Sequence, residues 1–292
     1  MSGADGRTSP SRTAPVRRVL FRPLRAVVQW PLERLDPSPR LLARRTAGGP
    51  LPGMVLVAVY RRRLAPVLGE LLAQLPAGGR AALWALDEPA PELAAVTVGS
   101  GPGERLALLN HLVASAAPGP EEWVLASDDD VRLTRGTPAT LLRAAARLGL
   151  DLAQPAHTWS SEVSHRFTRR RALVLARTTR WVEQGPLLLF GPRAVARLLP
   201  LREDVRWPAW GIEAGWSRAR DEGISLGIVD GVTMRHVQRV NATRYSWQDA
   251  ERQEAALLRE AGFPSTRSLQ VDEARWRAWQ AAPPAGFPRA AS

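Results

Sequence analysis

Several residue types and patterns are missing from this sequence, and each absence excludes a class of protein or site. There is no cysteine, which excludes disulfides, thiolate metal sites and cysteine nucleophiles. No segment approaches the roughly 18 uncharged apolar residues that a membrane-spanning helix requires. The opening stretch, MSGADGRTSPSRTAPVRR, also lacks the apolar core of a secretory signal. We therefore expect a soluble, cytoplasmic protein.

Lysine is absent as well, so all 40 basic residues are arginine. Together with abundant alanine, proline and tryptophan, this indicates a compositional bias, and arginine richness alone says little about function. The net charge is +12, and residues 1–50 hold ten arginines against three acidic residues. Such a basic segment can contact an anionic membrane, nucleic acid or an acidic partner, or it can simply be solvated. We expect a solvated tail; among the binding roles, contact with an anionic membrane is favoured over nucleic-acid binding.

The chain divides into three parts. Residues 1–50 form a basic, largely disordered segment, with short apolar clusters at 19–21 and 27–28 and a Gly-Pro linker at its end. Residues 51–245 form the folded domain, and 246–292 a C-terminal helical segment with a Pro-rich tail. With 45% hydrophobic residues among 292, the chain can bury one sizeable core.

The middle part alternates short apolar runs with amphipathic stretches. This alternation predicts an α/β fold with a mostly parallel central sheet and flanking helices, a single domain plus tails. The expected strands are 54–60, 82–86, 93–98, 123–127, 151–153, 172–176, 187–190, 226–229 and 232–237. The expected helices are 64–75, 103–117, 138–148, 193–199, 212–222 and one that opens at the capping box of Ser246 and stops near Gly262.

Three consecutive aspartates, Asp128, Asp129 and Asp130, follow the apolar strand 123–127 directly. Ligands bind outside the carboxyl ends of strands in open parallel sheets. Three adjacent carboxylates repel one another unless a cation neutralises them, and their oxygens suit Mg²⁺ or Mn²⁺. In an extended segment Asp128 and Asp130 point the same way, so they can hold one divalent ion that bridges a nucleotide's diphosphate. The alternative is a polar turn in which an aspartate caps the next helix.

The order of these segments resembles glycosyltransferases of the GT-A fold, in which an Asp-x-Asp motif ends a strand after the nucleotide-binding half. The stretch from Gly103-Glu104-Arg105 through Leu109-Asn110 to residues 123–130 is similar to family 2 transferases. The downstream half looks like a little-characterised family of glycosyltransferase-like proteins from plants and bacteria. Its matching segments are Gln154-Pro155-Ala156, residues 161–165, Val182-Glu183, residues 210–213, residues 227–230 and His236. The resemblance covers roughly residues 54–245.

This resemblance implies a GT-A-like (Rossmann-like) fold and a metal-dependent transfer of sugar from a nucleoside-diphosphate sugar to an acceptor hydroxyl on a glycan, lipid or small molecule. It implies that His236 joins Asp128 and Asp130 in holding Mn²⁺ or Mg²⁺, because neutral imidazole suits Mn²⁺. A surface or core role for His236 is the alternative. The donor-binding residues it implies are Arg105, Asn110, Asp128 and Asp129.

Two glutamates are candidate catalytic bases. Glu213 opens a helix, where the helix dipole favours its ionised form, and the resemblance implies that it deprotonates the acceptor hydroxyl. The relatives often have Asp at this position, so this chain departs from them, and simple helix capping is the alternative. Glu183 is the rival base or an acceptor-hydroxyl ligand, although its place before a Gly-Pro turn also fits a structural role.

Arginines, histidines and tryptophans gather in the second half. One or two of the arginines can clamp the donor's phosphates or attract a phosphorylated acceptor, while the others are solvated; they are Arg166, Arg169, Arg170, Arg171, Arg177 and Arg180. His157 and His165 lie in the same region, and we expect neither to contact substrate. The tryptophans can pack against sugar rings or fill the core; they are Trp159, Trp181, Trp207, Trp210 and Trp216.

Two other classes of function remain open. A nucleotidyltransferase would use a similar sheet and similar aspartates, and it would release pyrophosphate instead of a nucleoside diphosphate. A non-catalytic binding protein could keep the fold and use its basic tail on nucleic acid or membranes. Asp128, Asp130, Glu213 and His236 argue against this last class.

Overall fold

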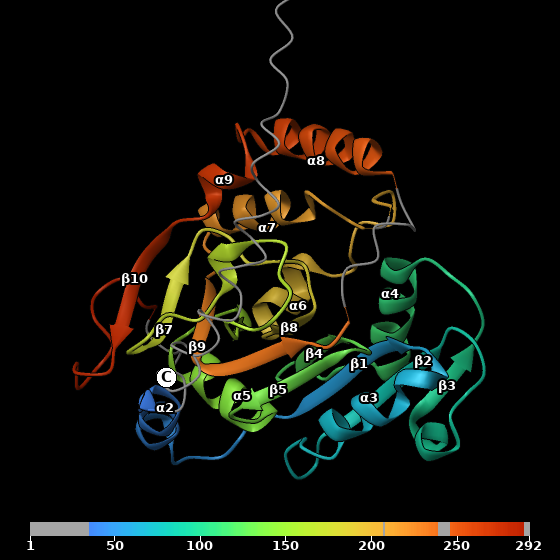
Figure 1. Ribbon diagram of the computed structural model, residues 1–292, viewed down its shortest axis with the longest axis horizontal. Helices are drawn as coiled ribbons and strands as arrows, with labels where there is room; N and C mark the ends of the chain where they lie inside the picture. Colours follow the sequence, from blue (N-terminus) through green and yellow to red (C-terminus); the bar gives the residue numbers. More distant parts are fainter. Residues whose placement is uncertain (1–34, 207, 239–245, 289–292) are drawn as a thin grey trace, which may run out of the picture. The chain divides into compact units, whose positions relative to one another are not determined.

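The computed structural model describes residues 35–206, 208–238 and 246–288. The described residues from Pro37 onwards belong to one compact unit. The apolar clusters expected at 19–21 and 27–28, and Trp207, lie outside the described residues. A single ten-stranded sheet runs through the unit in the order β10-β7-β9-β6-β8-β4-β1-β2-β3, and β5 pairs with β9 (Figure 1). In the described part of the chain, no helix combines the length and apolar character needed to cross a bilayer.

One half of the sheet consists of parallel strands, as the sequence predicted. In it, β1 lies between β2 and β4. Every residue of β1 is buried, because its alternate side chains enter the cores on the two faces of the sheet. The strands of this half are β1 (Met54–Tyr60), β2 (Arg80–Ala85), β3 (Thr97–Ser100) and β4 (Trp123–Asp128).

The other half is mixed. Here β6 runs parallel to β9, whereas β8, β7, β10 and β5 join their neighbours antiparallel. The expected strands 226–229 and 232–237 are one long strand, whose register shifts beside Asp230 where β6 pairs with it. The strands are β5 (Val131–Arg135), β6 (Leu152–His157), β7 (Val174–Thr179), β8 (Leu187–Phe190), β9 (Leu226–His236) and β10 (Asp272–Arg277).

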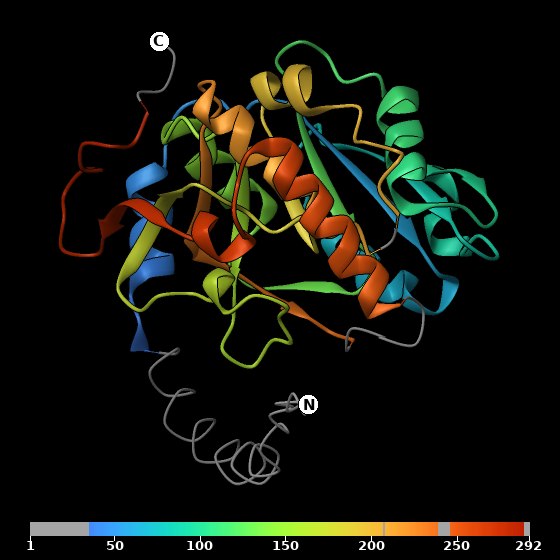
Figure 2. The same cartoon turned by 90° about the horizontal axis from the view of Figure 1, so that it is seen from above.

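Helices cover both faces of the sheet (Figures 1 and 2). One core lies between the sheet and α2, α3 and α5; the other lies beneath α4, α6 and α7, and α8 packs on α7. The helices are α2 (Ser38–Thr46), α3 (Ala65–Leu72), α4 (Arg105–Ala116), α5 (Pro138–Arg147), α6 (Pro192–Leu198), α7 (Ile212–Asp221), α8 (Trp247–Ala261) and α9 (Thr266–Leu269). As predicted, the Ser246 side chain caps α8, which ends at a left-handed Gly262.

The structure corrects the expected strand 93–98. Residues Pro91–Val96 form a 3-10 helix, η2, and the strand begins only at Thr97. Proline at the first position favours this turn, and the Thr97 hydroxyl donates to the carbonyl of Leu93 at 2.8 Å. A second 3-10 turn, η1 (Arg62–Leu64), precedes α3, and η3 (Arg166–Thr168) precedes β7.

The division at residues 50 and 245 stays a prediction. The elements just outside both boundaries pack on the sheet. Leu42 of α2 is fully buried against Gly231 of β9, where an added Cβ would lie 2.7 Å from a Leu42 methyl carbon. Beyond α8, strand β10 pairs with β7 and buries Trp276.

Arg177 joins three strands through a buried ion-pair network. Its guanidinium, with no exposed surface, donates to Asp230 of β9 at 3.0 Å and to Asp272 of β10 at 3.0 Å. Removing one partner of a buried pair leaves the other charge without compensation. We expect Arg177→Met to lower the free energy of unfolding by about 3–5 kcal/mol in urea titration.

The control is Arg180→Met. Arg180 directly follows β7, and this variant breaks its partly exposed ion pair with Asp221. This variant is expected to cost about 1 kcal/mol or less. Equal losses in the two variants would contradict the role given to Arg177.

Candidate functional site

The candidate site lies at the edge of the sheet where the parallel strands β1 and β4 end. Val59 of β1 pairs with Asp128 at the end of β4, and the chain then turns through Asp129 and Asp130 into β5. Because β5 runs antiparallel to β9, Val131 pairs with His236. The end of β9 therefore comes to the same edge as the aspartates.

Asp128, Asp130 and His236 form a group that could hold a metal ion. Each offers one ligand atom, and these atoms lie within 4.8 Å of one another. His236 Nε2 lies 2.9 Å from Asp130 Oδ1, and the backbone N–H of Val237 donates to the Asp130 carbonyl at 2.8 Å. Two carboxylate oxygens and an imidazole nitrogen are a donor set that fits Mn²⁺, and the carboxylates also suit Mg²⁺. Burial opposes charge on His236, but its bond to Asp130 and the nearby carboxylates raise its pKa.

Asp129 makes a different contact from its neighbours, and it lies with Asp130 in a turn after β4, not in the extended segment that was expected. Its carboxylate accepts the backbone N–H of Arg61 at 2.8 Å, and the Arg61 guanidinium lies 3.6 Å away. Burial raises the pKa of Asp129 to about 6, and the charges of Asp128 and Asp130 add to the shift. Asp129 thus ties the end of β4 to the residue that follows β1. Arg61 was not predicted, although its place after a buried strand could have indicated it.

Arg105, at the start of α4, links the aspartates to the opposite wall. Its Nε donates to Asp128 Oδ1 at 2.8 Å, and another guanidinium nitrogen donates to the Gln184 side chain at 2.9 Å. The backbone N–H of Gln184 in turn donates to Glu213 at 3.1 Å. A continuous chain of hydrogen bonds therefore joins the predicted metal ligand Asp128 to the predicted base Glu213.

Asn110 lies elsewhere. Its amide donates to the Leu201 carbonyl at 2.8 Å and to Glu203 at 2.9 Å, and its oxygen accepts the Leu201 N–H at 2.7 Å. It is not among the residues that line the cavity described below. In this structure Asn110 fastens α4 to the segment after α6, and its donor-binding role stays a prediction.

Glu213 and Glu183 are both buried. Glu213 accepts backbone N–H groups from Gln184 and Gly211, each at 3.1 Å. Burial raises the pKa of Glu213 to about 7. Burial, followed by the charge of Glu213, raises the pKa of Glu183 to about 8.

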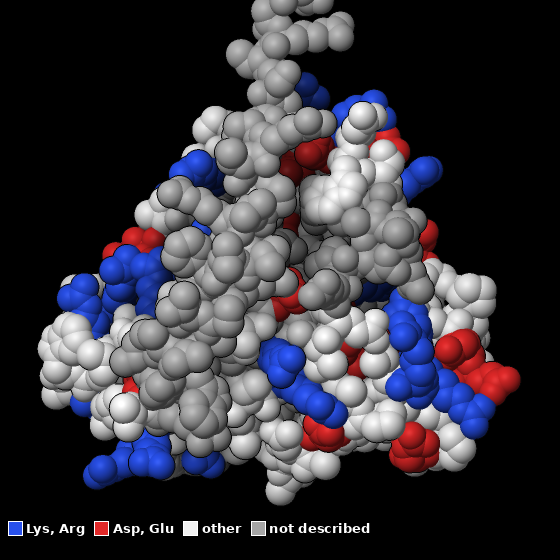
Figure 3. Space-filling view, viewed as in Figure 1, with Lys and Arg blue, Asp and Glu red and all other residues white. Residues whose placement is uncertain are grey.

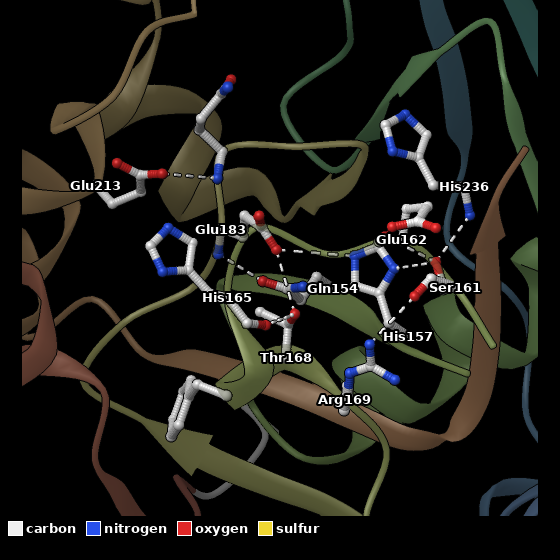
Figure 4. Close-up of polar contacts among 12 residues, drawn as sticks. Gln154, His157, Ser161, Glu162, His165, Thr168, Arg169, Glu183, Glu213 and His236 are labelled. Carbon is white, nitrogen blue, oxygen red and sulfur yellow. Dashed lines mark hydrogen bonds and ion pairs between the residues drawn. The ribbon is translucent and has the colours of Figure 1, made fainter. Parts of the chain in front are cut away.

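A buried polar network surrounds Glu183 (Figure 4). Its carboxylate accepts from the Thr168 hydroxyl at 3.2 Å, and its backbone N–H donates to the Gln154 side chain at 2.6 Å. His157 Nε2 lies 3.7 Å from the Glu183 carboxylate. Gln154 belongs to one of the segments that resemble the glycosyltransferase-like family, but no sequence pattern predicted its contact with Glu183.

The protonation of His157 follows from its other contact. The Ser161 hydroxyl donates to the Glu162 carbonyl at 3.0 Å and accepts the backbone N–H of His236 at 3.0 Å. His157 Nδ1, 2.9 Å from the same hydroxyl, must then donate to it. The lone pair on Nε2 therefore faces Glu183, which favours a protonated Glu183. Burial lowers the pKa of His157 to about 3, so the imidazole is neutral.

These side chains share one cavity of about 450 Å³. It is lined by Asp128, Asp129, Asp130, Arg105, Glu183, Glu213 and His236, and by His157 and His165, which were expected not to contact substrate. The structure therefore gathers all but one of the predicted site residues. In the view of Figure 3, acidic atoms are visible in the hollow at the centre of this face.

None of the six arginines between 166 and 180 lines this cavity. Arg171 and Arg177 pair with Asp272, and Arg180 pairs with Asp221. Arg169 donates to the carbonyls of Trp159 and Ser161. These four arginines therefore contact β10, α7 and the segment 159–161, and none of the six is among the residues that line the cavity.

Of the described tryptophans in this half, Trp210 alone lines the cavity. Its ring meets that of Trp247 edge to face, with centroids 5.0 Å apart. Trp181 and Trp216 are core residues, and Trp181 packs against the ring of His165. Trp159 is exposed, so the described members of the set are divided among the core, the surface and one cavity wall.

Comparison with known proteins shows the fold. No family model and no curated protein matches the sequence. Among solved structures, GalNAc-T7 with UDP, GalNAc and Mn²⁺ aligns with a TM-score of 0.51 and 11% identity, over 72% of this chain and 48% of that one. The fold is GT-A-like.

The chain spans about half the length of the GalNAc-T7 chain, 48% of it. S. aureus TarS 1–349 with UDP-GlcNAc aligns at a TM-score of 0.48 and 12% identity, over 75% of this chain and 69% of that one. The expected Rossmann-like architecture, with parallel core strands and flanking helices, is confirmed.

The raised pKa values predict how stability depends on pH in the metal-free protein. A folded-state pKa of about 8 for Glu183 and about 7 for Glu213, against 4.5 ordinarily, favours the protonated carboxyls in the native state. Their stabilising contribution is complete below pH 4.5 and is lost as pH rises through 7 to 8. His157 and His165 act in the opposite direction, but only below their ordinary value of 6.5.

We therefore expect the wild type to lose stability relative to Glu183→Gln between pH 6.5 and 8.5, because glutamine mimics the neutral carboxyl and does not ionise. Urea unfolding in EDTA at several pH values measures the difference. Glu122→Gln, which removes a carboxyl whose pKa is lowered by Arg80, should show no such trend. A pH-independent difference for Glu183→Gln would show that Glu183 is already ionised in the native protein throughout this window, so that its pKa is not raised.

Proposed function

We propose that this chain is a metal-dependent glycosyltransferase that moves a sugar from a nucleoside-diphosphate sugar to an acceptor hydroxyl. The observation that carries the proposal is that one cavity is lined both by the Asp128, Asp130 and His236 group and by two buried glutamates. The GT-A-like fold supports it, and the matched GalNAc-T7 structure contains UDP, GalNAc and Mn²⁺.

In this proposal Asp128, Asp130 and His236 hold Mn²⁺ or Mg²⁺. A bound divalent ion supplies positive charge that stabilises the departing nucleoside diphosphate. Arg105 lines the cavity beside Asp128, so its guanidinium can orient the donor's phosphates. Asp129 acts on the donor site indirectly, because it fixes Arg61 at the end of β1.

Glu213 is the proposed base and Glu183 its rival. A carboxyl whose pKa is about 7 is matched to proton transfer near neutral pH. Two backbone N–H groups hold its oxygens in place. Glu183, whose neutral form is favoured beside His157, suits hydrogen bonding to an acceptor hydroxyl. We also propose a cytoplasmic location and a peripheral membrane contact through residues 1–50.

The donor site is tested by calorimetric titration of UDP and GDP with Mn²⁺ and again with EDTA. We expect one nucleotide to bind only with the metal, and Asp130→Ala to weaken that binding at least about tenfold, or about 1.4 kcal/mol, because a metal ligand is lost. Asp204→Ala removes an exposed carboxylate paired with Arg202 and should bind like the wild type. Metal-independent binding that is unchanged in Asp130→Ala would refute the metal site.

The released product separates the enzyme classes. A glycosyltransferase releases a nucleoside diphosphate from the nucleotide sugar, whereas a nucleotidyltransferase releases pyrophosphate. Nucleotide binding would favour the non-catalytic alternative if no nucleoside diphosphate is released from any nucleotide sugar and no pyrophosphate is released from a nucleoside triphosphate with a sugar phosphate.

The two glutamates are distinguished by single substitutions. We expect Glu213→Gln to lower sugar transfer or donor hydrolysis by about 10²–10⁴-fold while metal-dependent nucleotide binding is retained, because glutamine keeps the shape and cannot accept the proton. Glu183→Gln should lower turnover less. The pH–rate profile of the wild type should rise through about pH 7, the pKa of Glu213. The reverse order of the two losses would assign the base to Glu183.

A further inference from the structure

The described arginines that line the cavity all come from one half of the chain, together with Glu104 and the aspartates. Arg61 and Arg63 follow β1, and Arg105 opens α4, so all three come from the chain before β4. They line the part of the cavity that also holds Asp128 to Asp130. Positive charge at neutral pH is thus available where the proposed donor's phosphates would lie.

The opposite wall, built from residues after β5, carries acidic side chains, of which Glu183 is favoured in its neutral form. Glu162, Glu183 and Glu213 line it. In the described part of this wall no arginine lines the cavity. The six arginines between 166 and 180 belong to the same half of the chain, but none of them is a lining residue. His236 also comes from this half, but it is paired with Asp130 at 2.9 Å.

The two other histidines of this wall add no positive charge at neutral pH. Burial lowers the pKa of His165 to about 4 and that of His157 to about 3. Gln270 Nε2 lies 2.8 Å from His165 Nδ1, so the amide donates to that nitrogen. The neutral ring then carries its proton on Nε2 and can donate a hydrogen bond to a hydroxyl oxygen.

Trp210 provides an apolar surface on the same wall. Its ring is fixed by the edge-to-face contact with Trp247. An aromatic face packs against the apolar face of a sugar ring. The wall therefore combines a flat apolar surface with carboxylates and neutral imidazoles, which bind hydroxyl and ammonium groups.

We propose that this wall, defined as Glu162, His165, Glu183, Trp210 and Glu213, takes a sugar or polyol acceptor that is uncharged or carries an amine, and excludes phosphorylated and carboxylated acceptors. Among the described residues of this wall, a phosphate or carboxylate would lose its hydration without gaining an arginine, and it would lie beside Glu162 and the partly ionised Glu213. An ammonium group would gain a carboxylate partner. This inference rests on the proposed function, because it assumes that the cavity binds a donor on its arginine side.

The test compares acceptors that differ only in charge. The probes are glucose, galactose and mannose, each as the methyl glycoside, the 2-amino sugar, the 6-phosphate and the 6-uronate. Saturation-transfer NMR and competition titration measure their binding with and without UDP and Mn²⁺. We expect neutral and amino members to bind and their anionic counterparts to bind at least about tenfold more weakly. Anionic members that bind as tightly as the neutral ones, or no binding by any neutral or amino member, would overturn the inference.

A charge reversal on the wall provides a second measurement. Glu162→Arg should raise the affinity for the 6-phosphate and 6-uronate sugars relative to the methyl glycosides, at least about fivefold. Glu92→Arg makes the same change of charge on the exposed 3-10 helix η2, away from the cavity, and should leave the ratio unchanged. Glu162→Gln, a smaller change, should move the ratio in the same direction if the arginine variant does not fold.

Different results would contradict the acceptor inference and the proposed function. If neither UDP nor GDP binds in the presence of Mn²⁺, the proposed donor site is contradicted. Failure of the acceptor proposal would appear in the ratio of anionic to neutral probes, which is measured with and without nucleotide. An unchanged ratio in Glu162→Arg, with the variant folded, would count against the wall defined above.

Discussion

The pairing of β5 with β9 is the constraint on which the site depends. Val131 lies opposite His236, so the aspartates before β5 meet the histidine at the end of β9. Side chains alternate along a strand, and a shift of one residue in this register would turn the imidazole to the other face of the sheet. The bond from the Val237 N–H to the Asp130 carbonyl continues the pairing just past the end of β9. The proposed metal ligands are therefore held by backbone geometry as well as by their side chains.

The two walls of the cavity are connected through Gln184. Its side chain accepts from Arg105, which holds Asp128, while its backbone N–H donates to Glu213. Three hydrogen bonds thus connect Asp128, a proposed metal ligand, with Glu213, the proposed base. The buried glutamates are satisfied by backbone donors and hydroxyls, and desolvation, more than any neighbouring charge, raises their pKa values. This cavity places arginines paired with aspartates on one side and two buried glutamates with raised pKa values on the other.

Local sequence patterns predicted the regular elements well where burial was continuous. The run 54–60 and the strand before Asp128 are present as expected, because strands buried on both faces need uninterrupted apolar residues. The prediction was wrong at 93–98, where proline begins a 3-10 turn. Strands β5 and β10 were missed, since β5 is short and β10 is an edge strand with only Trp276 buried. An edge strand has one neighbour, so its sequence needs little apolar character.

The sequence by itself determined the parallel core, the place of the aspartate triplet at a strand end and the acidic chemistry of the site. These follow from local burial and from the rule that strand ends carry the ligands. Only the tertiary structure decided that His236 reaches Asp130, that Asn110 and the arginines of 166–180 do not line the cavity, and that His157 faces Glu183. Those contacts join residues far apart in the chain. They depend on strand register and on which side chains the packing removes from water, neither of which a local pattern specifies.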